Sequence, residues 1–129
     1  MASVLADIER LIRPGTAIPK PESEGNSVVK RLWGTRRGQP ALVYSMPNHK
    51  NPAAPHEKGV NKPEWVQAAK HLAVAGNFTR SWFNEAMREC KDEGDCNFTT
   101  IGGVFELLGY AVYERPAVYR KRPEYEGED

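Results

Sequence analysis

The sequence predicts a single α+β domain: an N-terminal helix and a β-hairpin, then three helices that lead into a second β-hairpin. Three observations support this. Between residues 62 and 109, apolar residues recur three times at helical spacing, and a glycine follows each run. Residues 27–47 and 110–121 each hold two short β-type runs separated by turn residues. A chain of 129 residues is long enough for one hydrophobic core.

The chain starts with a short amphipathic helix at residues 3–12, within a predicted N-terminal unit of residues 1–13. Its apolar face is formed by Val4, Leu5, Ile8, Leu11 and Ile12. Ser3 precedes these residues and is a suitable N-cap. A helix of this length is not stable by itself, so we expect it to dock on its own domain or on a second copy of the chain. Residues 14–26, rich in proline and glycine, are expected to be an extended connector.

Residues 27–61 predict a basic hairpin followed by a long loop. The arms of the hairpin are residues 28–33 and 41–46, and the turn segment between them is residues 34–40. Residues 47–61 have no periodicity and are expected to be a loop that holds His49 and His56. Loops of this length are usually either functional or disordered.

The three helices of residues 62–109 have clear start and stop signals. The predicted N-caps are Asn61, Thr79 and either Thr99 or Thr100, and the predicted stops include Gly76 and Gly109. Glu64, three residues after Asn61, predicts a capping box. Gly102 and Gly103 lie inside the third helix, where paired glycines cost about 2 kcal/mol in helix propensity. They therefore predict the close approach of a neighbouring helix or of a ligand.

A helical trio followed by a hairpin with a break near Pro116 resembles a winged helix-turn-helix unit, here over residues 62–122. The resemblance is one of element order and length. It implies that the third helix is a recognition helix and that the hairpin around Pro116 is the wing. Members of this family mostly bind DNA, and some mediate only protein–protein contacts, so the resemblance implies one of these two functions.

Charge is distributed unevenly along the chain, although the net charge is only +1. Seven Lys and Arg residues and a single acid, Glu57, lie between Lys30 and Lys62, while residues 123–129 form an acidic tail. This asymmetry indicates an anionic partner for the basic segment or, alternatively, a solvated surface that serves solubility. The predicted nucleic-acid-binding residues are Lys30, Arg31, Arg36, Arg37, Thr99, Thr100, Arg115, Arg120, Lys121 and Arg122.

The third helix is an unusual recognition helix because its predicted exposed arc lacks Lys and Arg. That arc consists of Thr99, Thr100, Gly103, Glu106 and Leu107. Proteins neutralise DNA phosphates with basic side chains. We therefore expect DNA or RNA to be bound mainly by the basic hairpin and the wing.

Two other functions compete with nucleic-acid binding. A protein-interaction or homodimerisation module would use Leu107, Tyr110 and Tyr113 as its interface. A small enzyme would use the loop that holds His49 and His56, although no spacing in that loop matches a catalytic or metal-binding motif. The sequence therefore predicts a protein without catalytic residues, metal site or cofactor.

Cysteine usage and hydropathy indicate the compartment. Cys90 and Cys96 are close enough in sequence to close a disulfide loop, but cytoplasmic thiols are normally reduced. No apolar run reaches the roughly 18 residues that span a bilayer, and Asp7, Glu9 and Arg10 interrupt the N-terminal apolar pattern. We therefore expect a cytoplasmic protein that does not enter a membrane.

Overall fold

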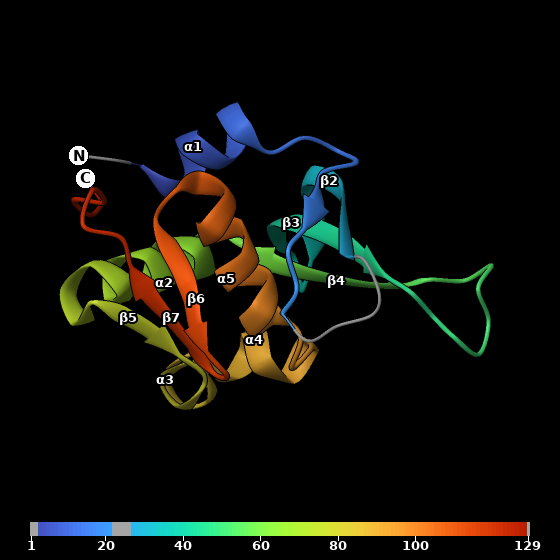
Figure 1. Cartoon of the computed structure of the whole chain (residues 1–129). Helices are drawn as coiled ribbons and strands as arrows, with labels where there is room; N and C mark the ends of the chain where they lie inside the picture. Colours follow the sequence, from blue (N-terminus) through green and yellow to red (C-terminus); the bar gives the residue numbers. More distant parts are fainter. Residues whose placement is uncertain (1–2, 22–26, 129) are drawn as a thin grey trace.

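The computed structural model describes residues 3–21 and 27–128, and it confirms a mixed helix and sheet architecture (Figure 1). Five residues of the predicted connector, 22–26, and the last residue of the predicted acidic tail lie outside the described residues. The elements, in chain order, are α1 (Val4–Leu11), β1 (Ala17–Ile18), β2 (Ser27–Arg36), β3 (Gln39–Met46), β4 (His56–Asn61), α2 (Lys62–Ala75), β5 (Asn77–Thr79), α3 (Arg80–Ala86), α4 (Arg88–Glu93), α5 (Asn97–Leu108), β6 (Ala111–Arg115) and β7 (Val118–Lys121).

The strands form two antiparallel sheets on either side of α5 (Figure 1). The larger sheet has the order β1-β2-β3-β4, and the smaller one has the order β5-β7-β6. Helix α5 contacts β6 of the small sheet and both edge strands, β1 and β4, of the large sheet. It is therefore the central element of the domain.

The predicted N-terminal helix and first hairpin are confirmed, with a tighter turn than expected. Ser3 Oγ accepts a hydrogen bond from the Ala6 N–H at 3.4 Å, as an N-cap does. In the hairpin, Arg36 pairs directly with Gln39. The two residues between them, Arg37 and Gly38, have φ values of 51° and 75°, the left-handed pair that a two-residue hairpin turn requires.

The expectation of a loop over residues 47–61 is wrong for its second part. Residues 56–61 form β4, which pairs with β3 along its whole length. The remaining residues, 47–55, project from the sheet as an arm (Figure 1). Asn48 stabilises the arm, because its Oδ1 accepts hydrogen bonds from the backbone N–H groups of Lys50 (3.1 Å) and Asn51 (3.2 Å).

The helices of the second half begin at the predicted N-caps only in part, and their number differs from the prediction. Glu64 Oε1 accepts the Asn61 N–H at 2.8 Å, and Thr79 Oγ1 accepts the Trp82 N–H at 3.2 Å. The predicted second helix is in fact two helices, because the backbone leaves helical geometry at Met87 (φ −120°, ψ 50°).

Helix α5 also starts earlier than predicted. Cys96, and neither threonine, is its N-cap, and the Cys96 carbonyl already accepts the Thr100 N–H at 3.0 Å. The side chains of Thr99 and Thr100 have another partner, described below.

The C-terminal hairpin is confirmed and gains a strand that the sequence did not predict. Residues Arg115 and Val118 pair across the turn, and Ala117 occupies a left-handed position at φ 69°. The additional strand is β5, in which Phe78 pairs with Tyr119 of β7. Phe78 is fully buried.

The paired glycines of α5 admit close neighbours, as predicted, but these are neither a helix nor a ligand. A Cβ atom added to Gly102 would lie 2.1 Å from the ring of Tyr119. A Cβ atom added to Gly103 would lie 2.4 Å from the backbone carbonyl oxygen of Pro19. Any larger residue would therefore displace β7 or the segment that contains Pro19.

The two ends of the chain are tied together, which explains where α1 docks. The Val4 N–H donates to both carboxylate oxygens of Glu128, at 2.9 and 3.0 Å. Tyr110 stacks on Tyr125 with ring centroids 4.0 Å apart, and its hydroxyl contacts Asp7. Of the two docking options left open by the sequence, α1 thus packs on its own domain, against α2 and α5.

Candidate nucleic-acid interface

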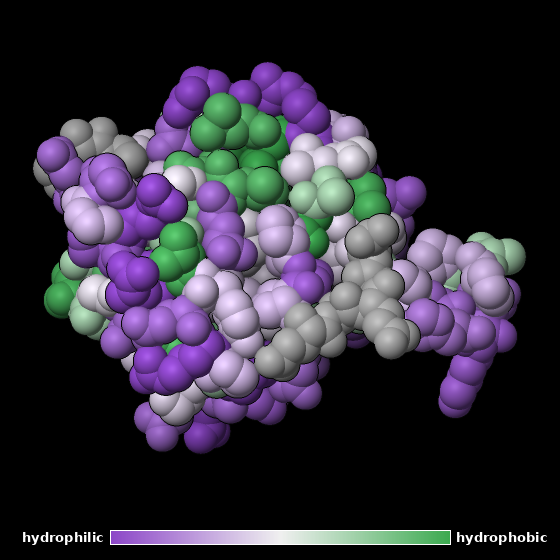
Figure 2. Space-filling model, viewed as in Figure 1, coloured by the Kyte–Doolittle hydropathy of each residue, from purple (hydrophilic) through white to green (hydrophobic). Residues whose placement is uncertain are grey.

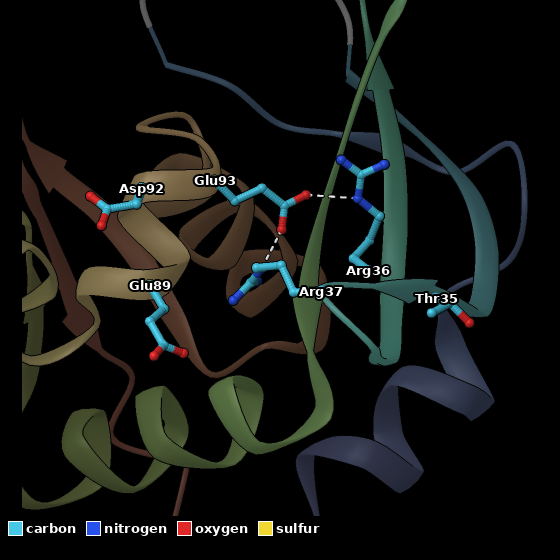
Figure 3. Close-up of a pocket in the computed structure, with 6 residues that line it drawn as sticks. All are labelled: Thr35, Arg36, Arg37, Glu89, Asp92 and Glu93. Atoms are coloured by element: carbon cyan, nitrogen blue, oxygen red, sulfur yellow. Dashed lines mark hydrogen bonds and ion pairs between the residues drawn. The ribbon is translucent and has the colours of Figure 1, made fainter.

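The two arginines at the hairpin tip turn onto the body of the domain. The Glu93 carboxylate of α4 accepts from Arg36 Nε at 2.8 Å and from Arg37 Nε at 2.5 Å (Figure 3). Glu64 of α2 accepts from both terminal nitrogens of Arg37, at 2.7 and 2.8 Å. The side chain of Glu93 is only 7% exposed. This geometry is that of an internal ion-pair network.

The same side chains satisfy the backbone of the edge strand β4. Glu93 Oε2 accepts the Gly59 N–H at 3.0 Å, and Arg37 donates to the Gly59 carbonyl at 3.2 Å. Arg36 donates to the Glu57 carbonyl at 3.3 Å. Unpaired strand edges invite association, and here charged side chains cap the edge. Hydrogen bonding to Glu64 raises the pKa of Arg37 above its ordinary value, so Arg37 stays charged in the network.

An open pocket of about 620 Å³ lies beside this network. It is lined by Thr35, Arg36, Arg37, Glu89, Asp92 and Glu93. The carboxylates of Glu89 and Asp92 point away from the arginines in Figure 3, while Glu93 lies between them. Because acids outnumber arginines in the lining, the pocket is a poor receptor for phosphate.

The remaining basic residues of the first hairpin are arranged differently. Arg31 donates to Glu57 at 2.8 Å, and this hydrogen bond holds the pKa of Glu57 below its usual range. Lys30 is exposed and makes no ion pair with any residue that the structure describes. Neither residue adds to the pocket.

The ammonium group of Lys20 binds the first turn of α5, where the sequence predicted nucleic-acid contacts. Its Nζ donates to the Cys96 carbonyl at 3.0 Å, to Thr99 Oγ1 at 2.9 Å and to Thr100 Oγ1 at 2.6 Å. Burial lowers the pKa of Lys20 to about 8. Thr100 and Gly103 are buried, so the predicted exposed arc is wrong at these two positions. No sequence signal identified Lys20, which stands between two prolines in the predicted connector.

Polar groups behind Lys20 form a small buried cluster. The Tyr44 hydroxyl donates to Asn97 Oδ1 at 2.5 Å and lies 3.1 Å from Cys96 Sγ. Cys96 Sγ in turn lies 3.2 Å from Met46 Sδ. Cys90 and Cys96 are both free thiols, and burial raises the pKa of Cys90. The disulfide loop that their spacing permits is therefore not formed.

The hairpin predicted to be the wing, β6 and β7 with their turn, has its arginines at the surface. The side chains of Arg115, Arg120 and Arg122 are 65%, 53% and 45% exposed. Arg115 and Arg120 share Glu114, at 2.5 and 3.4 Å, and Arg122 pairs with Glu124 at 3.4 Å. Exposed pairs of this kind contribute roughly 0–1 kcal/mol, so these guanidinium groups are free to exchange a carboxylate for another anion.

Lys121 is the exception among the basic residues of the wing. Its Nζ donates to the backbone carbonyls of Arg122 and Tyr125, at 3.1 Å each. It therefore ties the C-terminal tail to the wing.

The predicted protein interface is only partly at the surface. Leu107 is 39% exposed, and Leu11 of the neighbouring helix α1 is 45% exposed. Figure 2 shows hydrophobic surface gathered over α1 and the adjoining end of α5. Tyr110, by contrast, is 4% exposed, so its prediction as an interface residue is wrong. Tyr113 is half-buried and packs edge-on against Tyr119.

The histidines of the predicted loop do not converge with other reactive groups. His49 and His56 are exposed, one in the projecting arm and one at the start of β4. Tyr44, which lies between them and the first hairpin arm in sequence, directs its hydroxyl away from this loop, to Asn97 inside the domain. Among residues 3–21 and 27–128, no three His, Cys, Asp or Glu side chains are grouped to hold a metal. Within the same residues, no helix has the length and apolar character that crossing a membrane requires.

Comparison of the chain with protein-family models, with curated proteins and with solved structures found no match.

Proposed function

We propose that this chain is a small nucleic-acid-binding accessory protein that contacts phosphates through the wing of a winged-helix-like unit. The element order α2-β5-α3-α4-α5-β6-β7 supports the resemblance to a winged helix-turn-helix, since helices precede a two-stranded wing. The pairing of β5 with β7 extends that wing into a three-stranded sheet.

The observation that carries the proposal is the contrast between the two groups of arginines. At the hairpin tip, Arg36 and Arg37 share Glu93, which is almost fully buried, and Arg37 is also paired with Glu64. On the wing, three arginines share only two exposed carboxylates. The wing therefore presents net positive charge on exposed side chains, and the hairpin tip does not.

Guanidinium groups suit this role because they bind phosphate oxygens in a bidentate manner and stay charged at all physiological pH values. The affinity would come mainly from the release of counterions from the nucleic acid. The proposed activity requires neither a cofactor nor a catalytic residue.

Fluorescence anisotropy with a labelled 20-base-pair duplex tests the proposal. The variant R115Q/R120Q removes two exposed positive charges from the wing. We expect its affinity for the duplex to fall at least about tenfold at 0.1 M salt, because two phosphate contacts are lost. The matched control K70Q/R88Q removes the same charge from exposed positions on α2 and α4.

The control should bind within about twofold of the wild type. Equal losses in the two variants would mean that only net charge matters, and undetectable binding by the wild type at low salt would reject the function.

The hydrophobic surface over α1 and α5 favours a second candidate, self-association. Leu11 and Leu107 are both well exposed there, and homodimers commonly bury such apolar patches. The variant L107E should then lower the mass measured by sedimentation, whereas V74E, at a 90% exposed position on α2, should not. A wild-type chain that sediments as a monomer at high concentration would reject this candidate.

A further inference from the structure

We propose that the protein holds the sugar–phosphate backbone of its nucleic acid without reading base sequence, because its own residues 16–20 cover the recognition face of α5. These residues are called the strap below. This inference rests on the proposed function and adds to it the class of ligand: duplexes of any sequence.

The strap is bound to the start of α5 by Lys20. The Lys20 ammonium donates hydrogen bonds to the first turn of the helix, at 2.6–3.0 Å from Cys96 O, Thr99 Oγ1 and Thr100 Oγ1. In a recognition helix, residues near this end would reach base edges in the major groove. Here an ammonium group of the same chain takes the hydroxyl groups that would have made those contacts.

The strap also lies against the middle of α5. The Pro19 carbonyl oxygen would be 2.4 Å from a Cβ atom at Gly103, and Ile18 Cγ2 would be 2.7 Å from it. Ile18 itself is only 3% exposed. No base edge can approach α5 at this position while the strap is in place.

The strap is hydrogen-bonded to the large sheet, so it is an integral part of the fold. Ala17 pairs with Val28 and Ile18 with Ser27 in the large sheet. The Val29 N–H donates to the Thr16 carbonyl at 2.9 Å. Lifting the strap would expose Ile18 and break the edge of the sheet.

The positions of α5 that remain accessible are poorly suited to reading bases. Most of the helix is buried, namely Asn97, Phe98, Thr100, Ile101, Gly102, Gly103, Val104 and Phe105. Of the others, Thr99 is bonded to Lys20, and Glu106 accepts the Tyr113 N–H at 3.0 Å. Leu107 is exposed but apolar. Discrimination between base pairs needs several donors and acceptors at the groove, and the accessible side chains of α5 include only one carboxylate, Glu106, and one hydroxyl already bonded to Lys20.

Wing arginines alone would give binding that depends on salt and not on sequence. If each of the three exposed arginines neutralises one phosphate, log Kd should change with log salt concentration with a slope of about 3.

Selection from a duplex pool with a randomised centre tests the inference on the intact wild-type chain. We expect the pool to be retained at low salt and the retained sequences to match the input distribution after several rounds. Enrichment of a motif would overturn the inference and leave the proposed function standing. A pool that is not retained at all would overturn the proposed function and the inference with it.

A pair of variants with equal charge change gives a second readout. Thr99→Glu adds one negative charge at the start of α5, and Arg120→Ala removes one positive charge from the wing. We expect T99E to bind a fixed duplex within about twofold of the wild type and R120A to bind five- to tenfold more weakly at 0.1 M salt. Equal weakening in both variants, with the control K70Q/R88Q still binding like the wild type, would place the nucleic acid at α5 and overturn the inference.

Discussion

Two buried tyrosines, Tyr44 and Tyr119, differ in whether their hydroxyl group has a hydrogen-bond partner. The Tyr44 hydroxyl donates to Asn97 Oδ1 and lies beside Cys96 Sγ. The Tyr119 hydroxyl is equally buried but has no hydrogen-bond partner in the part of the chain that the structure describes. The ring of Tyr119 fills the space above Gly102, so its role is packing.

The variant Tyr119→Phe should therefore leave the free energy of unfolding unchanged or raise it by up to about 1 kcal/mol, because a buried hydroxyl without a partner is costly. Tyr44→Phe should lower it by about 1–2 kcal/mol, because Asn97 Oδ1 loses its donor. Urea denaturation of both variants measures the difference. Equal losses would show that the Tyr119 hydroxyl has a favourable contact after all.

Lys20 makes the free energy of unfolding increase with pH in the alkaline range. Burial lowers its pKa from 10.5 to about 8 in the folded protein. Between these two values the unfolded chain holds the proton and the folded chain has released it. The unfolded state therefore binds more protons, and stability rises with pH in this window.

Comparison of the wild type with Lys20→Met isolates this effect. The difference in unfolding free energy, wild type minus variant, should rise by roughly 2 kcal/mol between pH 7 and pH 9.5. Tyrosine ionisation affects both proteins alike and cancels in the difference. A difference that is flat across this range would mean that Lys20 titrates as a solvated amine.

At the level of elements, ion pairs and hydrogen bonds at the hairpin tip link the large sheet to the helices. Glu93 of α4 accepts hydrogen bonds from Arg36, from Arg37 and from the Gly59 N–H of β4. Removing this carboxylate leaves three donors without their acceptor. Breaking a buried ion pair costs about 3–5 kcal/mol, but both arginines are partly exposed, which reduces the cost.

Glu93→Ala should consequently lower the free energy of unfolding by about 2–3 kcal/mol in chemical denaturation. The control is Glu89→Ala, an exposed position on the same helix, where we expect a change below about 0.5 kcal/mol. If the two variants had similar stability, the network at the hairpin tip would be incidental to the fold.

Local patterns in the sequence predicted those elements whose signals lie within a few residues. These include α1 with its cap Ser3, the two hairpins, and α2 with Glu64 at its start. Strand β5 was missed because Phe78 meets its partner strand about forty positions later in the chain. The break at Met87 was missed because nothing in the helical periodicity marks it.

The basic residues of the candidate site could be predicted from the sequence, but their carboxylate partners could not. The arginines of the wing were identified, and they are at the surface. The arginines of the hairpin tip were identified as well, but their carboxylate partners lie 27 and 56 positions away along the chain. Sequence reading assigns charge correctly, but it cannot tell whether that charge is already paired within the fold.

In the whole molecule, these internal pairings leave positive charge unevenly exposed. The chain carries a net charge of only +1, and the basic residues of the hairpin tip are paired inside the domain. The strap closes off α5, and Glu128 fixes α1 in place. The wing is left as a positive surface that can exchange its partners.

The most direct test of this account is the affinity of two charge-matched variants, R115Q/R120Q and R36Q/R37Q, for one labelled duplex. Anisotropy should be recorded at a temperature at which circular dichroism shows both variants to be folded. We expect the wing variant to lose at least about tenfold in affinity and the hairpin variant to bind within about twofold of the wild type. Loss of affinity in the hairpin variant, with the wing variant unaffected, would contradict the account.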